Sequence, residues 1–460
     1  MDYLVLDTNI LLLDAYNVIN IAKKHTIQPI IVLPETVLDE IDSKKSGTSE
    51  IAYQARQFTR LLSKATRSPV VIEGSLITNV LELEGVTIWI CALTDYPTFS
   101  DAEQNIRSDR KILHVADLLS RKHDNVAFCS VDGMCSLRAE AMGLKTYEHR
   151  LVEETTAEFI RYLTVSEAVF SQLHDSLIID VDPDYRIENY NYVFSTEGTT
   201  QRKLATLSNG LIKVVGKVTE DEIRKQDLGP MNAGQLFLSK AILDPTIDIV
   251  VCDAKAGSGK TAVALSSAIK LVMDGKYESI TYIRTSVDDL EKAEEIGFLS
   301  GNNEKMEVYI RPLEDTLDFI ARNRLKSSKD KKDEEKFEEK VTETIEKLRA
   351  RCRIKGMITL GLRGRTIRNS VVIFDEVANA SKASLQKVLT RVGEGCKVVL
   401  IGSNNQIDNA YLNKYTNGLS VILNACKTTH SKVRLHAVSL QKVVRGPIAE
   451  FAEDIFTAKS

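Results

Sequence analysis

The amino-acid sequence predicts an α/β protein built from more than one domain. Short runs of β-branched and apolar residues alternate with helical patterns near both ends of the chain, which is typical of parallel sheets covered by helices. The length of 460 residues predicts two or three domains. We expect three zones: an α/β domain over residues 1–150, a small β-rich connector over residues 151–230, and an α/β domain over residues 231–460.

Composition excludes several classes of protein. Hydrophobic residues make up 43% and charged residues 27% of the chain, which excludes a disordered or collagen-like protein. The longest apolar runs are shorter than the ~18 residues of a membrane span, and the opening MDYLVLDTNILLL lacks a basic leader. Seven cysteines without zinc-ligand spacing predict reduced thiols and a cytoplasmic location. Because the net charge is −4 at pH 7, any nucleic-acid surface must be local.

Acidic residues mark the first zone, residues 1–150. Its β-rich runs (YLVL, PIIVLP, NVAFCSV) alternate with helical patterns around residues 50–65 and 110–121, which predicts a parallel sheet. Because the carboxyl ends of parallel strands meet at one edge, we expect acids near these ends to share a crevice. The four candidates are Asp7, Glu40, Asp109 and Asp132.

Such a group of carboxylates indicates a cation site. Clustered carboxylates repel one another, and a divalent cation relieves that repulsion. Mg²⁺ or Mn²⁺ on oxygen ligands activates water for attack on a phosphodiester. Glu35 is an alternative to Glu40 by position, and four acids that only cap helices are a structural alternative.

The first zone resembles the PIN domain, a metal-dependent ribonuclease fold. The resemblance implies that Asp7, Glu40, Asp109 and Asp132 bind the metal, with Asp7 and Asp109 in catalytic roles. The matching residues are Asp7-Thr8-Asn9, Pro34 with Glu40, Asp109 with Ile112-Leu113 and Ala116, and Asp132 with Leu137-Arg138-Ala139 and Gly143-Leu144.

The connector, residues 151–230, has a different pattern. Turn clusters (DVDPD, STEGTT, SNG) separate short apolar runs, and we expect a helix near residues 155–172 followed by a small sheet. Its aromatic residues could contact nucleic-acid bases, but alternation with valine is more typical of a sheet face. They are Tyr185, Tyr190, Tyr192 and Phe194.

The third zone, residues 231–460, returns to buried parallel strands. A segment rich in Lys, Glu and Asp, about residues 324–348, interrupts it, and we interpret this as a solvated helical insertion. The expected strands are residues 247–252, 279–284, 370–375, 397–402 and 433–438.

A phosphate-binding loop follows the first of these strands and opens a helix. Its small residues let backbone N–H groups surround a nucleoside triphosphate. Lys260 is expected to contact the β- and γ-phosphates, and the Thr261 hydroxyl to bind Mg²⁺. Ala254 stands where the pattern has glycine, which requires a negative φ there. The motif is Ala254-Lys255-Ala256-Gly257-Ser258-Gly259-Lys260-Thr261.

Two later strands supply the partners that this loop needs. The strand ending in Asp375-Glu376 is expected to bind Mg²⁺ through Asp375 and to polarise the attacking water through Glu376. The strand KVVLIG leads into Gly402-Ser403-Asn404-Asn405-Gln406, where a polar group such as Gln406 could sense the nucleotide. An ordinary turn after the strand is the alternative.

Residues 231–460 resemble the PhoH family of ATPases, relatives of RecA-like and superfamily 1 helicase cores. The resemblance implies ATP as the nucleotide, Gln235 as the adenine contact, Arg445 as an arginine finger or phosphate sensor, and a homohexamer. Ser403 stands where relatives usually carry Asp, and Ala378-Asn379 where they carry Gln-Asn, so ATP binding is more secure than coupling of hydrolysis to work. The matches are Ala256–Thr261, Arg284-Thr285, residues 297–301 and 309–313, Arg363-Gly364-Arg365-Thr366, Asp375-Glu376, residues 389–393, Gly402 with Gln406-Ile407-Asp408, and Val444-Arg445.

A basic stretch indicates where single-stranded RNA would bind. Residues 349–368 contain seven basic and no acidic side chains, directly before the strand that carries Asp375. We expect contacts to backbone phosphates with little base specificity. Solvated arginines, or arginines at a subunit contact, are the alternative.

Together these features predict a cytoplasmic ATPase and ribonuclease. ATP hydrolysis would move or remodel single-stranded RNA, as a helicase does, and the PIN-like domain would cut it with Mg²⁺ or Mn²⁺. DNA is an alternative substrate. The rival interpretation is a nucleotide-gated regulatory or binding protein with an inactive or toxin-like PIN domain, which Ser403 and Ala378 favour slightly.

Overall fold

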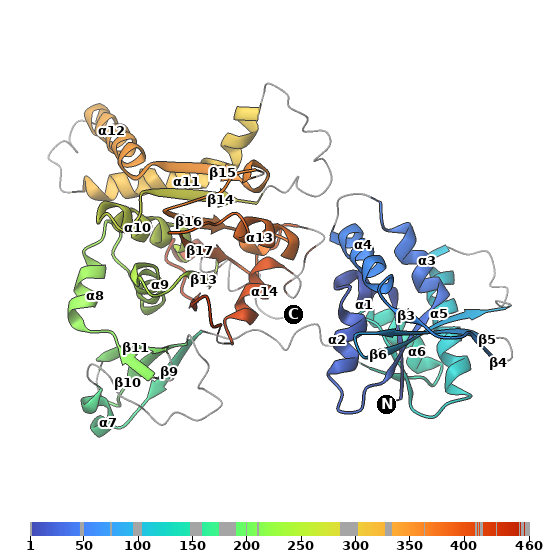
Figure 1. The fold of residues 1–460 in the computed structure, drawn as a ribbon. Helices are drawn as coiled ribbons and strands as arrows, with labels where there is room; N and C mark the ends of the chain where they lie inside the picture. Colours follow the sequence, from blue (N-terminus) through green and yellow to red (C-terminus); the bar gives the residue numbers. More distant parts are fainter. Residues whose placement is uncertain are drawn as a thin grey trace. The chain divides into compact units, whose positions relative to one another are not determined.

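The chain forms two compact units, Met1–Glu153 and Glu154–Ser460, in a computed structural model (Figure 1). Each unit is described by itself. The described residues are 2–46, 50–73, 76–94, 104–147, 159–173, 190–198, 200–208, 211–285, 302–326, 334–362, 364–409, 412, 414, 417–428, 430–449, 451 and 455.

The sheet of the first unit has the order β3-β5-β6-β2-β1-β7-β8, with β4 beside β5. Its core strands are parallel, as expected: β1 (Tyr3–Leu6), β2 (Ile30–Pro34), β6 (Val86–Leu93), β7 (Val126–Cys129) and β8 (Lys145–Thr146). The helices are α1 (Thr8–Leu13), α2 (Asn17–Lys23), α3 (Glu35–Ser43), α4 (Glu50–Leu62), α5 (Gln104–Ser120) and α6 (Gly133–Ala141).

An antiparallel extension corrects the expectation of a purely parallel sheet. Strands β3 (Thr66–Arg67), β4 (Val71–Glu73) and β5 (Leu76–Leu83) pair antiparallel, and β5 pairs with β6 in the same way. The turn between β5 and β6 is Glu84-Gly85, and both residues have positive φ, +50° and +80°. Such two-residue turns match the twist of a hairpin.

The main sheet of the second unit is parallel, with the order β15-β14-β16-β17-β13-β18. Helices cover both faces, and the strands are buried apolar runs, as the sequence predicts. The strands are β13 (Ile249–Ala254), β14 (Ser279–Arg284), β15 (Ile354–Ile358), β16 (Ser370–Asp375), β17 (Lys397–Gly402) and β18 (Leu435–Leu440), so β13 and β18 lie two residues later than expected. The helices are α8 (Lys217–Arg224), α9 (Ala233–Leu243), α10 (Lys260–Met273), α11 (Asn302–Arg324), α12 (Glu334–Cys352), α13 (Lys382–Leu389) and α14 (Gly418–Ala425), with 3-10 turns η4 (Thr359–Leu362) and η5 (Val377–Asn379).

The charged segment contributes α12 to this unit. Val341, Leu348 and Cys352 on α12 are buried, and α12 packs beside α11. Arg322 of α11 pairs with Glu338 of α12 at 2.7 Å. The insertion is therefore helical, with one apolar stripe packed and its charged side in solvent.

The connector region forms a second sheet within this unit, in the order β12-β11-β10-β9. The expected helix near residues 155–172 is wrong. Its described part is strand β9 (Ile160–Thr164), followed by the short helix α7 (Glu167–Gln172). Parallel pairing with β10 along its whole length, and the β-prone residues IRYLT, favour the strand. The other strands are β10 (Asn191–Ser195), β11 (Arg202–Ser208) and β12 (Leu211–Val214).

This small sheet packs onto the edge of the main sheet. The Asn191 amide donates to the Ala437 carbonyl at 2.9 Å, and the Phe159 N–H donates to the Ser439 hydroxyl at 3.1 Å. Tyr190, Tyr192 and Phe194 are buried, so they serve as core residues and not as a platform for bases. Tyr185 lies outside the described residues.

Candidate nucleotide and metal sites

The P-loop joins β13 to α10 at the carboxyl edge of the main sheet. Gly257 and Gly259 have φ of +67° and +81°, a conformation that favours glycine. A Cβ at Gly259 would lie 3.0 Å from the Gln235 amide nitrogen, so the loop leaves no room for a side chain there. Ala254 belongs to extended strand β13 and is not among the positive-φ residues, which is what the alanine requires.

Gln235 and Arg445, two of the expected nucleotide contacts, both touch this loop. The Gln235 amide donates to the Ser258 carbonyl at 2.9 Å, and its carbonyl accepts from the Met231 N–H at 2.7 Å. The backbone N–H of Arg445 donates to the Gly257 carbonyl at 3.1 Å, while its side chain is exposed. Both residues hold the loop through these bonds, and the Arg445 guanidinium remains accessible from solvent.

The acids of β16 lie against the start of α10. The Thr261 hydroxyl donates to Asp375 at 2.9 Å, and the Tyr282 hydroxyl donates to the same oxygen at 2.7 Å. The Lys260 ammonium pairs with Glu376 at 3.4 Å. Burial raises the pKa of Glu376, the charge of Asp375 raises it further, and Lys260 opposes both effects. The strand-loop-helix geometry thus brings both P-loop side chains to both acids.

This donor set fits a nucleotide with a divalent cation. Thr261 and Asp375 offer hard oxygen atoms side by side, which suits Mg²⁺. The buried hydroxyl of Ser258 has no hydrogen-bond partner among the residues that the structure describes, so a polar group at the loop remains to be satisfied. Glu376 has φ +56°, a strained conformation of the kind that concentrates at functional sites. Gln406, the remaining nucleotide candidate, is exposed on the loop after β17.

Asp7 is the centre of the site in the first unit. It follows β1, and only 3% of its surface is exposed. One carboxylate oxygen accepts from the Thr8 N–H at 2.7 Å, and the other accepts from the Ser130 hydroxyl at 2.5 Å and from the Asn9 amide at 3.4 Å. These bonds fix the orientation of the carboxylate at the end of the strand.

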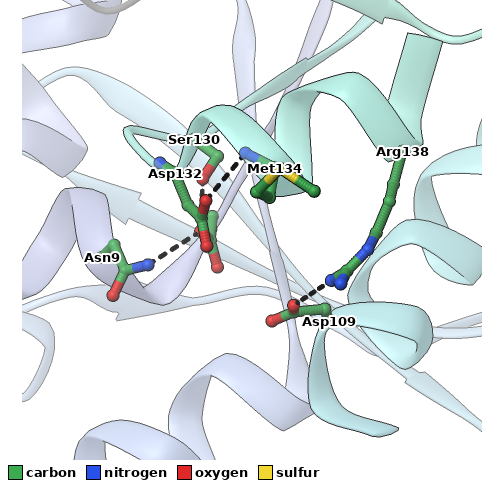
Figure 2. A network of polar contacts seen from close by, with 7 residues as sticks. Asn9, Asp109, Ser130, Asp132, Met134 and Arg138 are labelled. Carbon is green, nitrogen blue, oxygen red and sulfur yellow. Dashed lines mark hydrogen bonds and ion pairs between the residues drawn. The ribbon is translucent and has the colours of Figure 1, made fainter. Parts of the chain in front are cut away.

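The other three acids surround Asp7 from separate elements. Glu40 of α3 accepts from the Thr8 hydroxyl, Asp109 of α5 pairs with Arg138 at 2.8 Å, and Asp132 caps α6 through the Met134 N–H at 2.8 Å. Figure 2 shows Ser130, Asp132 and Met134 around one turn, with Arg138 directed toward Asp109. Glu35, the alternative to Glu40, is exposed.

The pKa values show that these carboxylates share one electrostatic field. Burial raises the pKa of Asp7 to about 6, and the charges of Asp109 and Glu40 also raise it. Burial raises the pKa of Asp109; Arg138 lowers it, whereas Asp132 and Glu40 raise it. Burial and the charges of Asp7, Asp109 and Asp132 raise the pKa of the Cys135 thiol.

The described acids of the first unit do not converge as tightly as the ligands of a bound metal ion. Among the described residues, no three His, Cys, Asp or Glu side chains are close enough to make a complete metal-binding group. The chemistry of the donors nevertheless fits a divalent cation, because one arginine faces several mutually repelling carboxylates.

Sequence reasoning assigned no role to the residues that support both sites, although it named Thr8 and Arg138 among the PIN matches. Thr8, Ser130 and Arg138 hold the acids of the first unit, and Tyr282 and Asp253 lie at the nucleotide site. The spacing Ser130-Val131-Asp132 was an available signal, because a hydroxyl two residues before a capping acid reaches the turn. Tyr282 carries no such local signal, since it meets Asp375 only through neighbouring strands.

The basic stretch is divided among different environments. Arg349 pairs with Glu314, and Arg353 lies 3.9 Å from Glu278. Lys355, Arg365 and Arg368 are exposed on and after the edge strand β15. Arg363 and residues 297–301 lie outside the described residues.

Comparison with known proteins agrees with this geometry. The PhoH-like protein family matches residues 227–457, which is half of the chain. The chain belongs to the PhoH-like protein family. The PIN domain family matches residues 4–150, so a PIN domain precedes the PhoH-like domain, as the sequence predicts.

Full-length relatives have the same extent. Protein PhoH2 of Bacillus subtilis strain 168 is 26% identical over 470 residues, covering 98% of this chain and 99% of that protein. Protein PhoH2 of Thermobispora bispora is 25% identical, covering 98% and 95%. This PhoH-like chain is therefore a nucleotide-binding protein that contains a PIN domain and is related to RNA function. Across the described residues, none of its helices is both long and apolar enough to span a membrane.

Proposed function

We propose that this PhoH-like protein couples ATP hydrolysis to metal-dependent cleavage of single-stranded RNA. The observation that carries the proposal is the presence of two separate carboxylate sites, one beside a P-loop and one around the buried Asp7. Each offers the groups that activate water for attack on a phosphorus atom.

In the PhoH-like domain, the residues divide the work on ATP. Lys260 would leave its partner Glu376 to contact the β- and γ-phosphates, which frees Glu376 to polarise the attacking water. Thr261 and Asp375 would hold Mg²⁺, which, when bound, neutralises charge on the phosphates. The Gln235 amide would contact adenine by giving up its bond to the Ser258 carbonyl, Gln406 would sense the nucleotide, and Arg445 would stabilise charge from the same or a neighbouring subunit.

In the PIN domain, Asp7, Glu40, Asp109 and Asp132 would hold Mg²⁺ or Mn²⁺. The bound cation supplies a nucleophilic water at neutral pH. Ser130, Thr8 and Asn9 keep the Asp7 carboxylate oriented, and Arg138 restrains Asp109 until the cation arrives. Asp7 and Asp109 would orient the water toward the scissile phosphodiester.

We further propose a cytoplasmic homo-oligomer, a hexameric ring, that binds the RNA backbone at the exposed Lys355, Arg365 and Arg368. The seven cysteines are all free thiols, which supports a reducing compartment. An arginine supplied across a subunit contact would complete the nucleotide site, as in other P-loop enzymes.

The decisive experiment follows both chemistries in the full-length protein. Phosphate release is measured with and without single-stranded RNA, and cleavage of end-labelled RNA with and without ATP, each in Mg²⁺ and in Mn²⁺. We expect RNA to stimulate ATP turnover and ATP to stimulate cleavage. If the protein binds ATP but RNA does not change the rate of phosphate release, the proposal that ATP hydrolysis moves RNA fails. The nucleotide-gated regulatory protein then becomes the better interpretation. Single-stranded DNA of the same sequence decides which nucleic acid is the substrate.

A further inference from the structure

A half-buried carboxylate beside the P-loop has no role in the mechanism above. Asp253 is on β13, immediately before Ala254, near the carboxyl edge of the sheet. It pairs in register with Gly402 of β17 on one side and with Ser439 of β18 on the other. Ligands of parallel sheets bind at this edge, so the carboxylate lies where nucleotide chemistry takes place.

Asp253 fixes the beginning of the loop that follows β17. Its carboxylate accepts from the Asn404 N–H at 3.1 Å. The Asn404 side-chain oxygen in turn accepts from the Asn417 amide at 2.9 Å and from the Ser420 hydroxyl at 3.1 Å, both at the start of α14. Burial raises the pKa of Asp253, and the nearby charge of Lys260 opposes this effect. The loop is thus attached both to the P-loop strand and to a helix.

The far end of the same loop is attached to the 3-10 turn η5, which follows the catalytic acids. Asn379, three residues after Glu376, accepts from the Asp408 N–H at 2.7 Å. Gln406 lies between the two attachments and is exposed. Strand β13, which leads into the P-loop, and the turn η5, which follows the catalytic acids, therefore set the position of residues 403–409.

We propose that Asp253 is a positioning residue for ATP hydrolysis, which holds residues 403–409 so that Gln406 stays aligned with the P-loop. This inference rests on the proposed ATPase function. Because an acceptor and not a negative charge is what the Asn404 N–H needs, an asparagine should replace Asp253, whereas an alanine should not.

The test compares Asp253→Ala and Asp253→Asn in the full-length protein. We expect Asp253→Ala to lower kcat for ATP about 10-fold or more and to change KM less than about 2-fold, because alignment is lost and phosphate binding is kept. Asp253→Asn should retain at least about half of wild-type kcat. Hydrogen exchange at residues 403–409 should accelerate in the alanine variant only. The control is Asp274→Ala, which removes an exposed acid at the other end of α10.

Each outcome is decisive. Equal kcat in the wild type and Asp253→Ala overturns the inference, as does an asparagine variant that is impaired as strongly as the alanine variant. A parallel loss of nucleotide binding, measured with a fluorescent ATP analogue, would mean that Asp253 serves the fold and not the alignment. If the alanine variant does not fold, Asp253→Leu, which keeps the volume of the side chain but has no acceptor, makes the same comparison. A wild-type protein without ATP turnover refutes the proposed function instead.

Discussion

The PIN domain and the PhoH-like domain arrange similar acids in opposite ways. In the PhoH-like domain each acid already has a partner, since Lys260 faces Glu376 and the hydroxyls of Thr261 and Tyr282 donate to Asp375. In the PIN domain, the described donors to the buried Asp7 are neutral, the charges of Asp109 and Glu40 raise its pKa, and the cation Arg138 pairs with Asp109 instead.

This difference determines what each site needs from its ligand. At the nucleotide site Lys260 is paired with Glu376, so an arriving triphosphate must compete with Glu376 for the Lys260 ammonium. At the acidic site the carboxylates repel one another, and a divalent cation reduces that repulsion. Because the cation binds only ionised carboxylates, its affinity there should depend strongly on pH. The variants below test this contrast, beginning with the largest expected effect.

Removal of the Lys260 ammonium from the P-loop should abolish ATP hydrolysis. We expect Lys260→Ala to lower the rate of phosphate release by about 100-fold or more, because the charge on the β- and γ-phosphates loses its partner. RNA cleavage measured without ATP should remain. Lys270→Ala, on the opposite end of the same helix, is the matched control and should be active. Normal turnover in Lys260→Ala would refute the P-loop assignment.

Neutralisation of Asp7 should abolish RNA cleavage alone. Asp7→Asn keeps the shape of the side chain but removes the charge that a cation requires, so we expect about 100-fold slower Mn²⁺-dependent cleavage with normal ATP hydrolysis. The exposed Glu35 provides the control, and Glu35→Gln should cleave normally. Loss of both activities in Asp7→Asn would indicate that Asp7 is needed for folding.

The raised pKa of Asp7 predicts opposite effects of pH with and without metal. The folded carboxyl has a pKa of about 6 against an ordinary 3.8, so without metal its stabilising proton is present below about pH 4 and lost as pH rises through about 6. The difference corresponds to about 2 to 3 kcal/mol. With Mn²⁺ the sign reverses, because only the ionised carboxylate binds the cation.

Thermal unfolding of the full-length protein checks this prediction. The increase in unfolding temperature on adding Mn²⁺ should be larger at about pH 7.5 than at about pH 5.5, and it should disappear in Asp7→Asn. A metal effect that does not change across this pH range would mean that the cation does not bind at Asp7.

The smallest effect is expected from a supporting residue of the nucleotide site. Tyr282→Phe removes the buried hydroxyl that donates to Asp375, so the free energy of unfolding should fall by about 1 kcal/mol. ATP turnover should fall only a few-fold, because Thr261 still donates to Asp375. Denaturant unfolding and phosphate release measure the two quantities. Tyr277→Phe, on a half-buried tyrosine, is the control and should change neither.

The sequence predicted most of the architecture because the signals are local. Apolar strand runs, the small residues of the P-loop and the acids after strands, such as Asp7 and Glu376, are all read within a few residues. The same local patterns predicted a helix where the structure has strand β9. Residues 160–164 form a strand by pairing with β10, which lies about thirty residues later in the chain. The hairpin at Glu84-Gly85 was not predicted either. Its two strands, β5 and β6, pair antiparallel through a turn in which both residues have positive φ.

What the sequence alone determined is therefore the set of chemical groups: a P-loop, a strand with two acids at its end, and four acids of the first unit, of which the structure places Glu40 inside α3 and Asp109 inside α5. Only the tertiary structure decided their environments, such as the burial of Asp7, the contact of Glu40 with Thr8, and the attachment of Asp253 to the loop after β17. The physical reason is that burial and long-range hydrogen bonds depend on which segments the fold brings together, and no local pattern records that choice.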